Sequence, residues 1–368
     1  MKRLLVLSVS AGAGHTRAAQ ALAAAARDRG ARVEHTDILE FTTPLYRRAY
    51  ADGYLQMVQR APQLWGYLYR ASDRRKRPRP APAFVRLFDR LEFGAFRRFV
   101  RSFRPDAVLT THFLACQVFA PYRKRGRDRF PLGVCLTDFD AHAFWVQPTA
   151  DRFFVATEEV AAVLAGRGIA PSKIAVTGIP IAAAFARRHE RTGARRELGL
   201  TGDRPVVLIL SGGAGVGAFA EAVRSVLGCG PVQILAVAGR NERLRRRLAA
   251  LRPPSGSTLR VFGFVEDIAS IMAAADLAVG KSGGLTASEC LAMGLPLVAF
   301  NPIPGQEERN ADFLMEAGAG VKALGTASLA YKIGELLSDR VRRGRMRRAA
   351  RQAARPRAAD DIIEKMGF

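Results

Sequence analysis

The chain contains 368 residues, of which 49% are hydrophobic and 24% are charged, a composition that predicts folded domains and excludes an intrinsically disordered protein. Lys and Arg number 57 against 33 Asp and Glu, and the resulting net charge of +24 attracts polyanions, whether nucleic acid or an anionic membrane surface. No stretch reaches the ~18 consecutive apolar residues that a membrane-spanning helix requires. The apolar start leads straight into a glycine loop rather than a cleavage site, so we interpret it as a strand and expect a cytoplasmic protein.

The first half of the chain alternates short apolar runs with longer polar or alanine-rich stretches. The apolar runs predict strands at residues 4–8, 31–37, 107–110, 132–136 and 152–156, and the alanine-rich stretch 16–29 predicts a helix. Short runs of this kind are typical of parallel strands that are buried on both faces.

The second half restarts the pattern, with predicted strands at 206–210, 233–238, 258–262, 277–279 and 297–300 and a helix from about Ala218. Repeated βα units predict an α/β protein with two doubly wound domains that face a cleft, where ligands meet the loops that follow the strands. We expect an N-terminal domain at 1–186, a C-terminal domain at 187–345 and a basic helical tail at 346–368. The arginine-rich stretch 187–204 is the expected linker.

A glycine loop follows the first predicted strand, between Ser10 and His15. Dinucleotide binding favours G-x-G-x-x-G, but Arg17 occupies the third glycine position, so a dehydrogenase is disfavoured. Two interpretations remain open. One is a tight strand-to-helix turn, and the other is a substrate site in which Gly12, Gly14 and the first helical N–H groups bind while His15 supplies proton chemistry.

Two further glycine loops occur in the second half. One begins at Ser211 and includes Gly212 and Gly213, which let the backbone approach a phosphate beside a helix N-terminus, although a flexible turn is the alternative. The other spans 280–289, where Gly-Lys-Ser suggests a P-loop, but Ala275 stands at the first required glycine. This segment still offers N–H groups and hydroxyls to a diphosphate and a carboxylate to a ribose diol. The residues concerned are Ser282, Gly283, Gly284, Thr286 and Glu289.

The segment 280–289, together with 292–296 and 304–310, resembles the donor-binding region of family 28 glycosyltransferases. These are inverting enzymes of the GT-B fold, with two Rossmann-like domains, and they use UDP-sugars. The resemblance implies that Thr286 and the nearby glycines contact the diphosphate and that Glu289 binds the ribose. The other implied donor contacts are Gln306 and Glu307 at the sugar and Arg240 and Phe264 at the uracil.

Three N-terminal motifs, at 8–15, 111–113 and 136–145, resemble the acceptor domain of diacylglycerol glycosyltransferases. That group includes monogalactosyldiacylglycerol synthases and bacterial diacylglycerol glucosyltransferases. The transferase that adds N-acetylglucosamine to lipid-linked muropeptide shares the fold and is the alternative, but its acceptor loop is usually richer in glycine. The residues that the resemblance implies near the acceptor are Gly12, Gly14, His112, His142 and Trp145.

The resemblance implies single displacement at the anomeric carbon, which requires a general base for the acceptor hydroxyl; His15 and Asp138 are the two candidates. His112 and His142 either support the cleft or are structural. Asp138 and Asp140 also spell D-x-D, the metal motif of another glycosyltransferase fold, but they follow a buried-strand pattern in the wrong architecture. The cysteines stand singly, which fits no zinc site. We expect no metal and no cofactor besides the UDP-sugar substrate.

A lipid acceptor would bring the protein to a membrane, and aromatic residues gather beside a basic run at 74–77. Tyr54 and Trp65 belong to this aromatic group, which suits a headgroup interface. Between residues 60 and 130, 18 basic residues accompany 5 acidic ones. Phenylalanines recur at helical spacing from Phe84 to Phe103, and core packing is the favoured interpretation of that stripe.

The sequence therefore predicts a peripheral enzyme of the inner membrane face that moves a hexose from a UDP-sugar to diacylglycerol. Galactose, glucose and glucuronic acid remain open as the sugar. A UDP-sugar 2-epimerase, which would act without an acceptor, is one rival. A nucleic-acid-binding protein is the other, but the chain has basic patches without a recognition motif, so no specific nucleic acid is expected.

Overall fold

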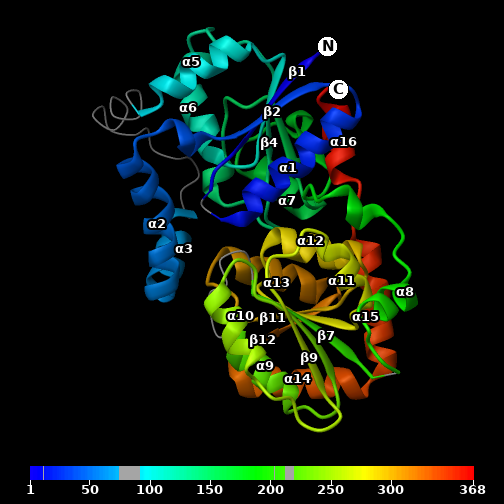
Figure 1. Cartoon of the computed structure of the whole chain (residues 1–368). Helices are drawn as coiled ribbons and strands as arrows, with labels where there is room; N and C mark the ends of the chain where they lie inside the picture. The colour runs from blue at the N-terminus through cyan, green and yellow to red at the C-terminus, as the bar shows by residue number, and fades with distance from the viewer. Residues whose placement is uncertain (11, 74–91, 203, 212–218) are drawn as a thin grey trace. The chain divides into compact units, whose positions relative to one another are not determined.

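The structure, a computed structural model, describes residues 1–10, 12–73, 92–202, 204–211 and 219–368 and divides the chain into two compact units (Figure 1). Unit 1 consists of residues 1–183 and 356–368, and unit 2 consists of residues 184–355. The tail expected at 346–368 is thus shared between the two units. Its last helix, α16 (Ala358–Lys365), lies beside α1 (Ala13–Asp28), because Ile362 and Ile363 are buried in the same apolar cluster as Leu22 (Figure 1).

In the described part of unit 1, six parallel strands form a sheet: β1 (Arg3–Ser8), β2 (Arg32–Asp37), β3 (Ala107–Thr110), β4 (Leu132–Cys135), β5 (Arg152–Val155) and β6 (Ile174–Val176). Their order across the sheet is β2-β1-β3-β4-β5-β6. The five strands predicted in this half are confirmed. The edge strand β6 escaped prediction because its apolar run is only three residues long and half-buried.

Helices cover this sheet and carry its aromatic core. Phe96 is fully buried and its ring lies 5.6 Å from that of Phe41, so the core interpretation of the phenylalanine stripe is confirmed for this residue. The part of the stripe from Phe84 to residue 91 lies outside the described residues. The further helical segments described in unit 1 are η1 (Ile38–Phe41), α2 (Pro44–Arg60), α3 (Pro62–Asp73), α5 (Gly94–Phe103), α6 (Phe113–Arg123), η2 (Ala143–Trp145), α7 (Glu158–Gly166) and η3 (Pro171–Lys173).

Unit 2 repeats the architecture. Within its described residues, six parallel strands are arranged in the order β12-β11-β10-β7-β8-β9. Their bounds are β7 (Val206–Leu210), β8 (Gln233–Val237), β9 (Thr258–Phe262), β10 (Leu277–Gly280), β11 (Leu297–Phe300) and β12 (Gly320–Ala323). All five strands predicted here are confirmed, and β12 is the addition.

The helical segments of unit 2 begin at its boundary with unit 1. They are η4 (Ala183–Ala186), α8 (Arg191–Glu197), α9 (Phe219–Leu227), α10 (Glu242–Ala249), α11 (Ile268–Ala274), α12 (Gly284–Ala292), α13 (Gln306–Glu316), α14 (Gly325–Ser338) and α15 (Arg340–Ala353). Among the helices described in either unit, none combines the length and apolar content of a membrane span.

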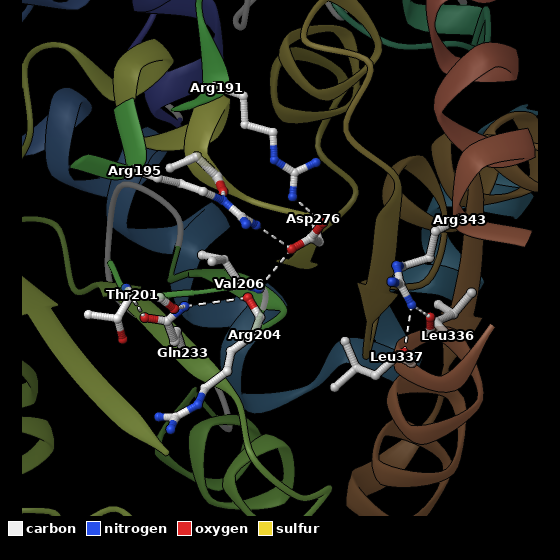
Figure 2. A network of polar contacts seen from close by, with 11 residues as sticks. Arg191, Arg195, Thr201, Arg204, Val206, Gln233, Asp276, Leu336, Leu337 and Arg343 are labelled. Atoms are coloured by element: carbon white, nitrogen blue, oxygen red, sulfur yellow. Dashed lines mark hydrogen bonds and ion pairs between the residues drawn. The ribbon is translucent and has the colours of Figure 1, made fainter. Parts of the chain in front are cut away.

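The stretch 187–204, expected as a linker, contains α8, and ion pairs hold this helix on unit 2. Figure 2 shows Arg191 and Arg195 directed at Asp276, which precedes β10. The second oxygen of Asp276 also accepts the Val206 N–H at 2.8 Å. Because this carboxylate joins α8 to the starts of two neighbouring strands, α8 is part of the packed unit.

Both sheets contain one topological switch point, where the chain leaves neighbouring strands in opposite directions. In unit 1 it lies between β1 and β3, and in unit 2 between β7 and β10. Loops that follow these two pairs of strands diverge and leave room for a ligand. The glycine loops identified in the sequence follow β1, β7 and β10, so each belongs to a switch point.

Candidate active site

In unit 1 the loop after β1 presents backbone N–H groups at the switch point. Gly12 is the N-cap of α1, has a φ of 153° and offers no side chain to cap the helix. A methyl group added at Gly12 or Gly14 would meet no atom within 4 Å, so the space beside both glycines is open. The loop is held by Asp37, whose carboxylate accepts the Ser10 N–H at 3.0 Å.

His15 lies in the first turn of α1 and is fixed by residues from two other loops. Its Nδ1 lies 2.6 Å from the carbonyl oxygen of Thr111 and 3.2 Å from the hydroxyl of Thr137. The Thr111 hydroxyl in turn donates to the His15 carbonyl at 2.9 Å. Because a carbonyl oxygen only accepts, the proton of neutral His15 is on Nδ1, and Nε2 carries the lone pair that a base needs.

A second histidine packs against the first. The rings of His15 and His112 lie 4.7 Å apart, edge to face, and His112 is buried. Nδ1 of His112 accepts the Leu114 N–H at 3.1 Å, so this residue caps α6. Burial lowers the pKa of His15 from 6.5 to about 4, and burial together with the charge of His15 lowers the pKa of His112 well below 6.5. Both rings are therefore neutral at pH 7.

His142 has a structural position. Nδ1 accepts the Phe144 N–H at 3.1 Å, which leaves the proton on Nε2 for the Tyr69 carbonyl at 3.0 Å. Asp73 reinforces this tie because its carboxylate accepts the Ala143 N–H at 2.8 Å. The interactions attach the end of α3 to the loop after β4. His142 thus positions α3 rather than offering a free ring nitrogen to a ligand.

The structure places the remaining acceptor candidates at different depths. Trp145 is buried, with its ring 6.4 Å from His15 and 6.5 Å from His112, so it belongs to the same cluster. Asp138 is half-buried in the loop after β4. Trp65 lies on α3, 5.9 Å from Tyr69, outside the histidine cluster. Tyr54 lies on α2, and its side chain is outside the described residues.

In unit 2 a pocket lies at the switch point between β7 and β10. Leu210, Ser211, Gly280, Lys281 and Asn301 are among its lining residues. Glycine relieves crowding at position 280, since a Cβ there would lie 3.1 Å from the Leu210 carbonyl oxygen, closer than most Cβ contacts. The predicted phosphate contacts Gly212 and Gly213 lie outside the described residues.

Two helices of unit 2 begin at this carboxyl edge with glycine N-caps. Gly283 precedes α12 and Gly305 precedes α13, so neither N-cap offers a side chain to its helix, although Glu308 of α13 accepts the Gly305 N–H at 3.1 Å. A methyl group at Gly283 would meet nothing within 4 Å, so the N-terminus of α12 is open. In contrast, Thr157 and Asn241 cap α7 and α10 with their side chains. Uncapped N–H groups carry partial positive charge and suit an anion.

The two glycine-capped segments are locked together. The Ser282 hydroxyl, fully buried, donates to the Glu307 carbonyl at 2.6 Å. One carboxylate oxygen of Glu307 accepts the Ile303 N–H at 2.8 Å. Burial raises the pKa of Glu307, whereas the charge of Lys281 lowers it. Glu307 and Ser282 therefore hold the loops in place, which leaves at most one Glu307 oxygen for a ligand.

The other predicted donor residues come from four segments along the same edge. Glu289 is buried on α12, and Thr286 is half-buried one turn earlier. Gln306, half-buried, opens α13. The guanidinium of Arg240 lies 4.9 Å from the centre of the Phe264 ring, which is 62% exposed. An exposed aromatic ring with one face covered by a cation offers its other face for stacking.

Comparison with known proteins decides the family. The monogalactosyldiacylglycerol (MGDG) synthase model matches residues 15–181, and the model of the glycosyltransferase family 28 C-terminal domain matches residues 206–365. Together these matches span most of both units. The chain is a family 28 glycosyltransferase. Processive diacylglycerol beta-glucosyltransferases of Bacillus cereus strain AH187 and Bacillus thuringiensis strain Al Hakam are 28% and 27% identical to it, over 98% of this chain and 92% of theirs.

Solved structures confirm the GT-B fold of this glycosyltransferase. Acinetobacter baumannii MurG is 18% identical, with a TM-score of 0.65 over 100% of this chain and 99% of MurG. The UDP co-structure of Staphylococcus aureus MnaA is 13% identical, with a TM-score of 0.63 over 99% of this chain and 95% of MnaA. At these identities the likeness concerns the fold alone.

Sequence reasoning missed three residues of the glycosyltransferase's candidate sites. Thr111 and Thr137 fix the His15 ring, and Lys281 lines the switch-point pocket. Thr111 was available as a signal, since it precedes His112 at the end of a predicted strand. The contact of Thr137 with His15 joins residues far apart in the sequence and becomes visible only once β1 and β4 share a sheet.

The buried histidines predict how stability depends on pH. His15 has a folded pKa of about 4 and an unfolded pKa of 6.5, so the unfolded chain binds the additional proton between these values. This contribution is present above pH 6.5 and is lost as the pH falls towards 4. From pH 7.5 to pH 5, His15 should cost about 2 kcal/mol of unfolding free energy.

Urea denaturation of the wild type and of His15→Asn at both pH values measures this difference. The variant should lose about 2 kcal/mol less than the wild type on acidification. An equal loss in both proteins would show that His15 is not the residue responsible.

Proposed function

We propose that this glycosyltransferase transfers glucose from UDP-glucose to the hydroxyl of diacylglycerol, with inversion at the anomeric carbon and without a metal ion or cofactor. It works as a peripheral protein on the inner face of the cell membrane. The observation that carries the proposal is similarity along 98% of the chain to processive diacylglycerol beta-glucosyltransferases. The geometry of both units supports it.

The donor fits the carboxyl edge of unit 2. The diphosphate of UDP-glucose lies at the open N-terminus of α12, where Thr286 adds a hydroxyl and Lys281 a positive charge. The buried carboxylate of Glu289 accepts from the ribose hydroxyls. The uracil stacks on the exposed face of Phe264, beside Arg240.

The sugar contacts come from the start of α13. Gln306 offers an amide, and the second carboxylate oxygen of Glu307 accepts from a sugar hydroxyl. Because the first oxygen is bonded to Ile303, Glu307 presents this acceptor in a fixed place. As the bond to UDP breaks, charge grows on the diphosphate, and helix N–H groups that are already oriented stabilise it without reorganisation.

His15 is the proposed base in unit 1. Its Nδ1 proton is held by Thr111, so Nε2 is the nitrogen that takes the proton from the diacylglycerol hydroxyl. The low pKa of His15 keeps the ring neutral and ready to accept at pH 7. Asp138 then forms a polar wall of the acceptor site rather than the base.

Membrane contact is assigned to the outer face of α3. Leu64, Tyr67 and Leu68 recur at helical spacing and are 54%, 65% and 42% exposed. The opposite face is anchored, since Tyr69 is buried and bonded to His142. An apolar stripe on a helix whose other face is fixed to the protein suits insertion among lipid headgroups.

The function is tested by incubating the protein with radiolabelled UDP-glucose or UDP-galactose and vesicles that contain diacylglycerol and phosphatidylglycerol. We expect a labelled glycolipid from UDP-glucose, resolved by lipid chromatography. A labelled glycolipid formed only from UDP-galactose would identify UDP-galactose, instead of UDP-glucose, as the donor. UDP-sugar conversion without lipid would favour a 2-epimerase, and neither product nor UDP binding would overturn the proposal.

The same assay identifies the base. His15→Asn should lower kcat by about 10²–10⁴-fold, because general base catalysis contributes that much. Asp138→Asn, the matched control, should change kcat by less than about tenfold. Both variants should keep the KM for UDP-glucose, since the donor binds to unit 2. A larger loss in Asp138→Asn would transfer the role of base to Asp138.

The membrane face is tested by vesicle sedimentation. Replacing Leu64 and Tyr67 together by Ser should weaken binding to phosphatidylglycerol vesicles by about tenfold or more, because two side chains lose their transfer into the lipid. The control replaces Leu324 and Tyr331 of unit 2, which are 65% and 69% exposed, by Ser. If both double variants lost the same vesicle affinity, α3 would have no specific role in membrane binding.

A further inference from the structure

Unit 2 contains a cluster of arginines at the amino ends of its strands, the edge opposite the proposed donor site. Arg191 and Arg195 come from α8, and Arg347 and Arg351 come from α15. Asp276, just before β10, lies among them. Figure 2 shows Arg191 and Arg195 pointing towards Asp276.

Both oxygens of Asp276 are already engaged, and neither forms an ion pair with the two arginines of α15. One of its oxygens pairs with Arg191. The other pairs with Arg195 at 2.6 Å and accepts the Val206 N–H at 2.8 Å. Among the described residues, no carboxylate lies within ion-pair distance of Arg347 or Arg351.

Arg347 has a guanidinium nitrogen that this arrangement leaves without a partner. Its Nη1 is buried and has no hydrogen-bond partner among the described residues. Burial and the charge of Arg191 lower the pKa of Arg347, Asp276 acts against this shift, and Arg351 and Arg195 lower the pKa further. A lysine or histidine in this place could release its proton, but a guanidinium stays charged in proteins. Arg347 as a whole is half-buried, and an acceptor beside its buried Nη1 would remove the cost of leaving that N–H group unpaired.

Arg351 is held next to it by close packing. Gly294, in the turn after α12, has a φ of 58°, and a Cβ there would lie 2.6 Å from Nε of Arg351. The missing side chain lets Arg351 lie directly over this turn. Arg351 is exposed, so its guanidinium is accessible to a ligand beside Arg347.

We propose that Arg347 and Arg351, backed by the Arg191–Asp276–Arg195 group, form a binding site for a phosphate group. Four guanidinium groups around one carboxylate leave an excess of positive charge, and the planar fork of arginine matches phosphate oxygens. The phosphate belongs to a soluble phosphate ester or to the headgroup of an anionic lipid. This site is independent of the proposed transfer reaction.

A ligand at this site would connect α8 and α15, the α-helices of unit 2 that lie next in the chain to the two crossings between the units. α8 follows the first point at which the chain passes between the units, and α15 precedes the second. An anion bonded to Arg347 and Arg351 adds the missing counter-charge between these helices. We therefore expect phosphate to stabilise unit 2 against thermal unfolding.

The test uses the full chain with saturating UDP, so that the donor site is occupied throughout. Tm is measured while inorganic phosphate replaces chloride at constant ionic strength. Wild type should gain stability with phosphate in a saturable way, and Arg347→Gln should require about tenfold more phosphate or show no gain. Arg345→Gln, an exposed arginine of the same helix, is the matched control and should respond as the wild type does.

A second readout keeps the test informative if Arg347→Gln differs in stability. Without phosphate, this variant should be at least as stable as the wild type, because an uncompensated buried charge has been removed. Absence of a saturable phosphate effect in the wild type, or equal loss in Arg347→Gln and Arg345→Gln, would overturn the proposal.

The source of the phosphate is resolved by competition. Vesicles of phosphatidylglycerol and of phosphatidylcholine are sedimented with each protein, with and without inorganic phosphate. Binding to phosphatidylglycerol that phosphate weakens in the wild type but not in Arg347→Gln assigns a lipid headgroup. A saturable Tm effect with no such difference in vesicle binding assigns a soluble phosphate ester.

Discussion

The structure depends on one constraint: both sheets are entirely parallel in their described strands and are buried on both faces. Such a sheet offers ligands little beyond its strand ends, and only at the switch point do the loops diverge enough to admit one. This explains why His15 and the switch-point pocket of unit 2 occupy equivalent positions in their units. Each follows a strand beside the switch, and each lies where a glycine loop precedes a helix. The chemistry differs because the residues that follow the glycines differ.

The N-cap residues differ between the helices at the proposed sites and several helices elsewhere in the fold. His112, Thr157 and Asn241 use side chains to satisfy the first N–H groups of their helices. Gly12 and Gly283 have no side chain for this purpose, so the N–H groups remain available at the carboxyl edge. A capped helix gains about 1 kcal/mol from its cap. A helix that gives up this contribution keeps its N-terminal charge for a phosphate, a carbonyl or a hydroxyl.

Most of the fold and the location of the sites followed from the sequence, because apolar runs and glycine loops are local signals. Every predicted strand is present, whereas β6 and β12 were missed because they have only three and four residues and are half-buried in part. The roles of individual residues were less accessible. His142 looked equivalent to His112, yet its partner is the Tyr69 carbonyl, a contact that only the folded loop after β4 creates. The expected linker was judged by composition, which cannot reveal that Asp276, far along the chain, fixes α8.

The arginines that give the chain its large positive charge differ in their burial and in their partners. Arg97 is buried, pairs with Asp128 at 2.6 Å and lies 3.7 Å from the centre of the Tyr122 ring, so its charge is fully compensated within the core of unit 1. Arg245 pairs with Glu242 on the surface, where such a pair adds little stability. Arg347 resembles Arg97 in having a buried guanidinium nitrogen but lacks a carboxylate among the described residues. Surplus charge on a surface is explained by solvation alone, whereas surplus charge in a protein interior demands a counter-ion. Arg347 is therefore the more informative arginine, because its buried guanidinium nitrogen without a partner indicates that a hydrogen-bond acceptor should bind beside it.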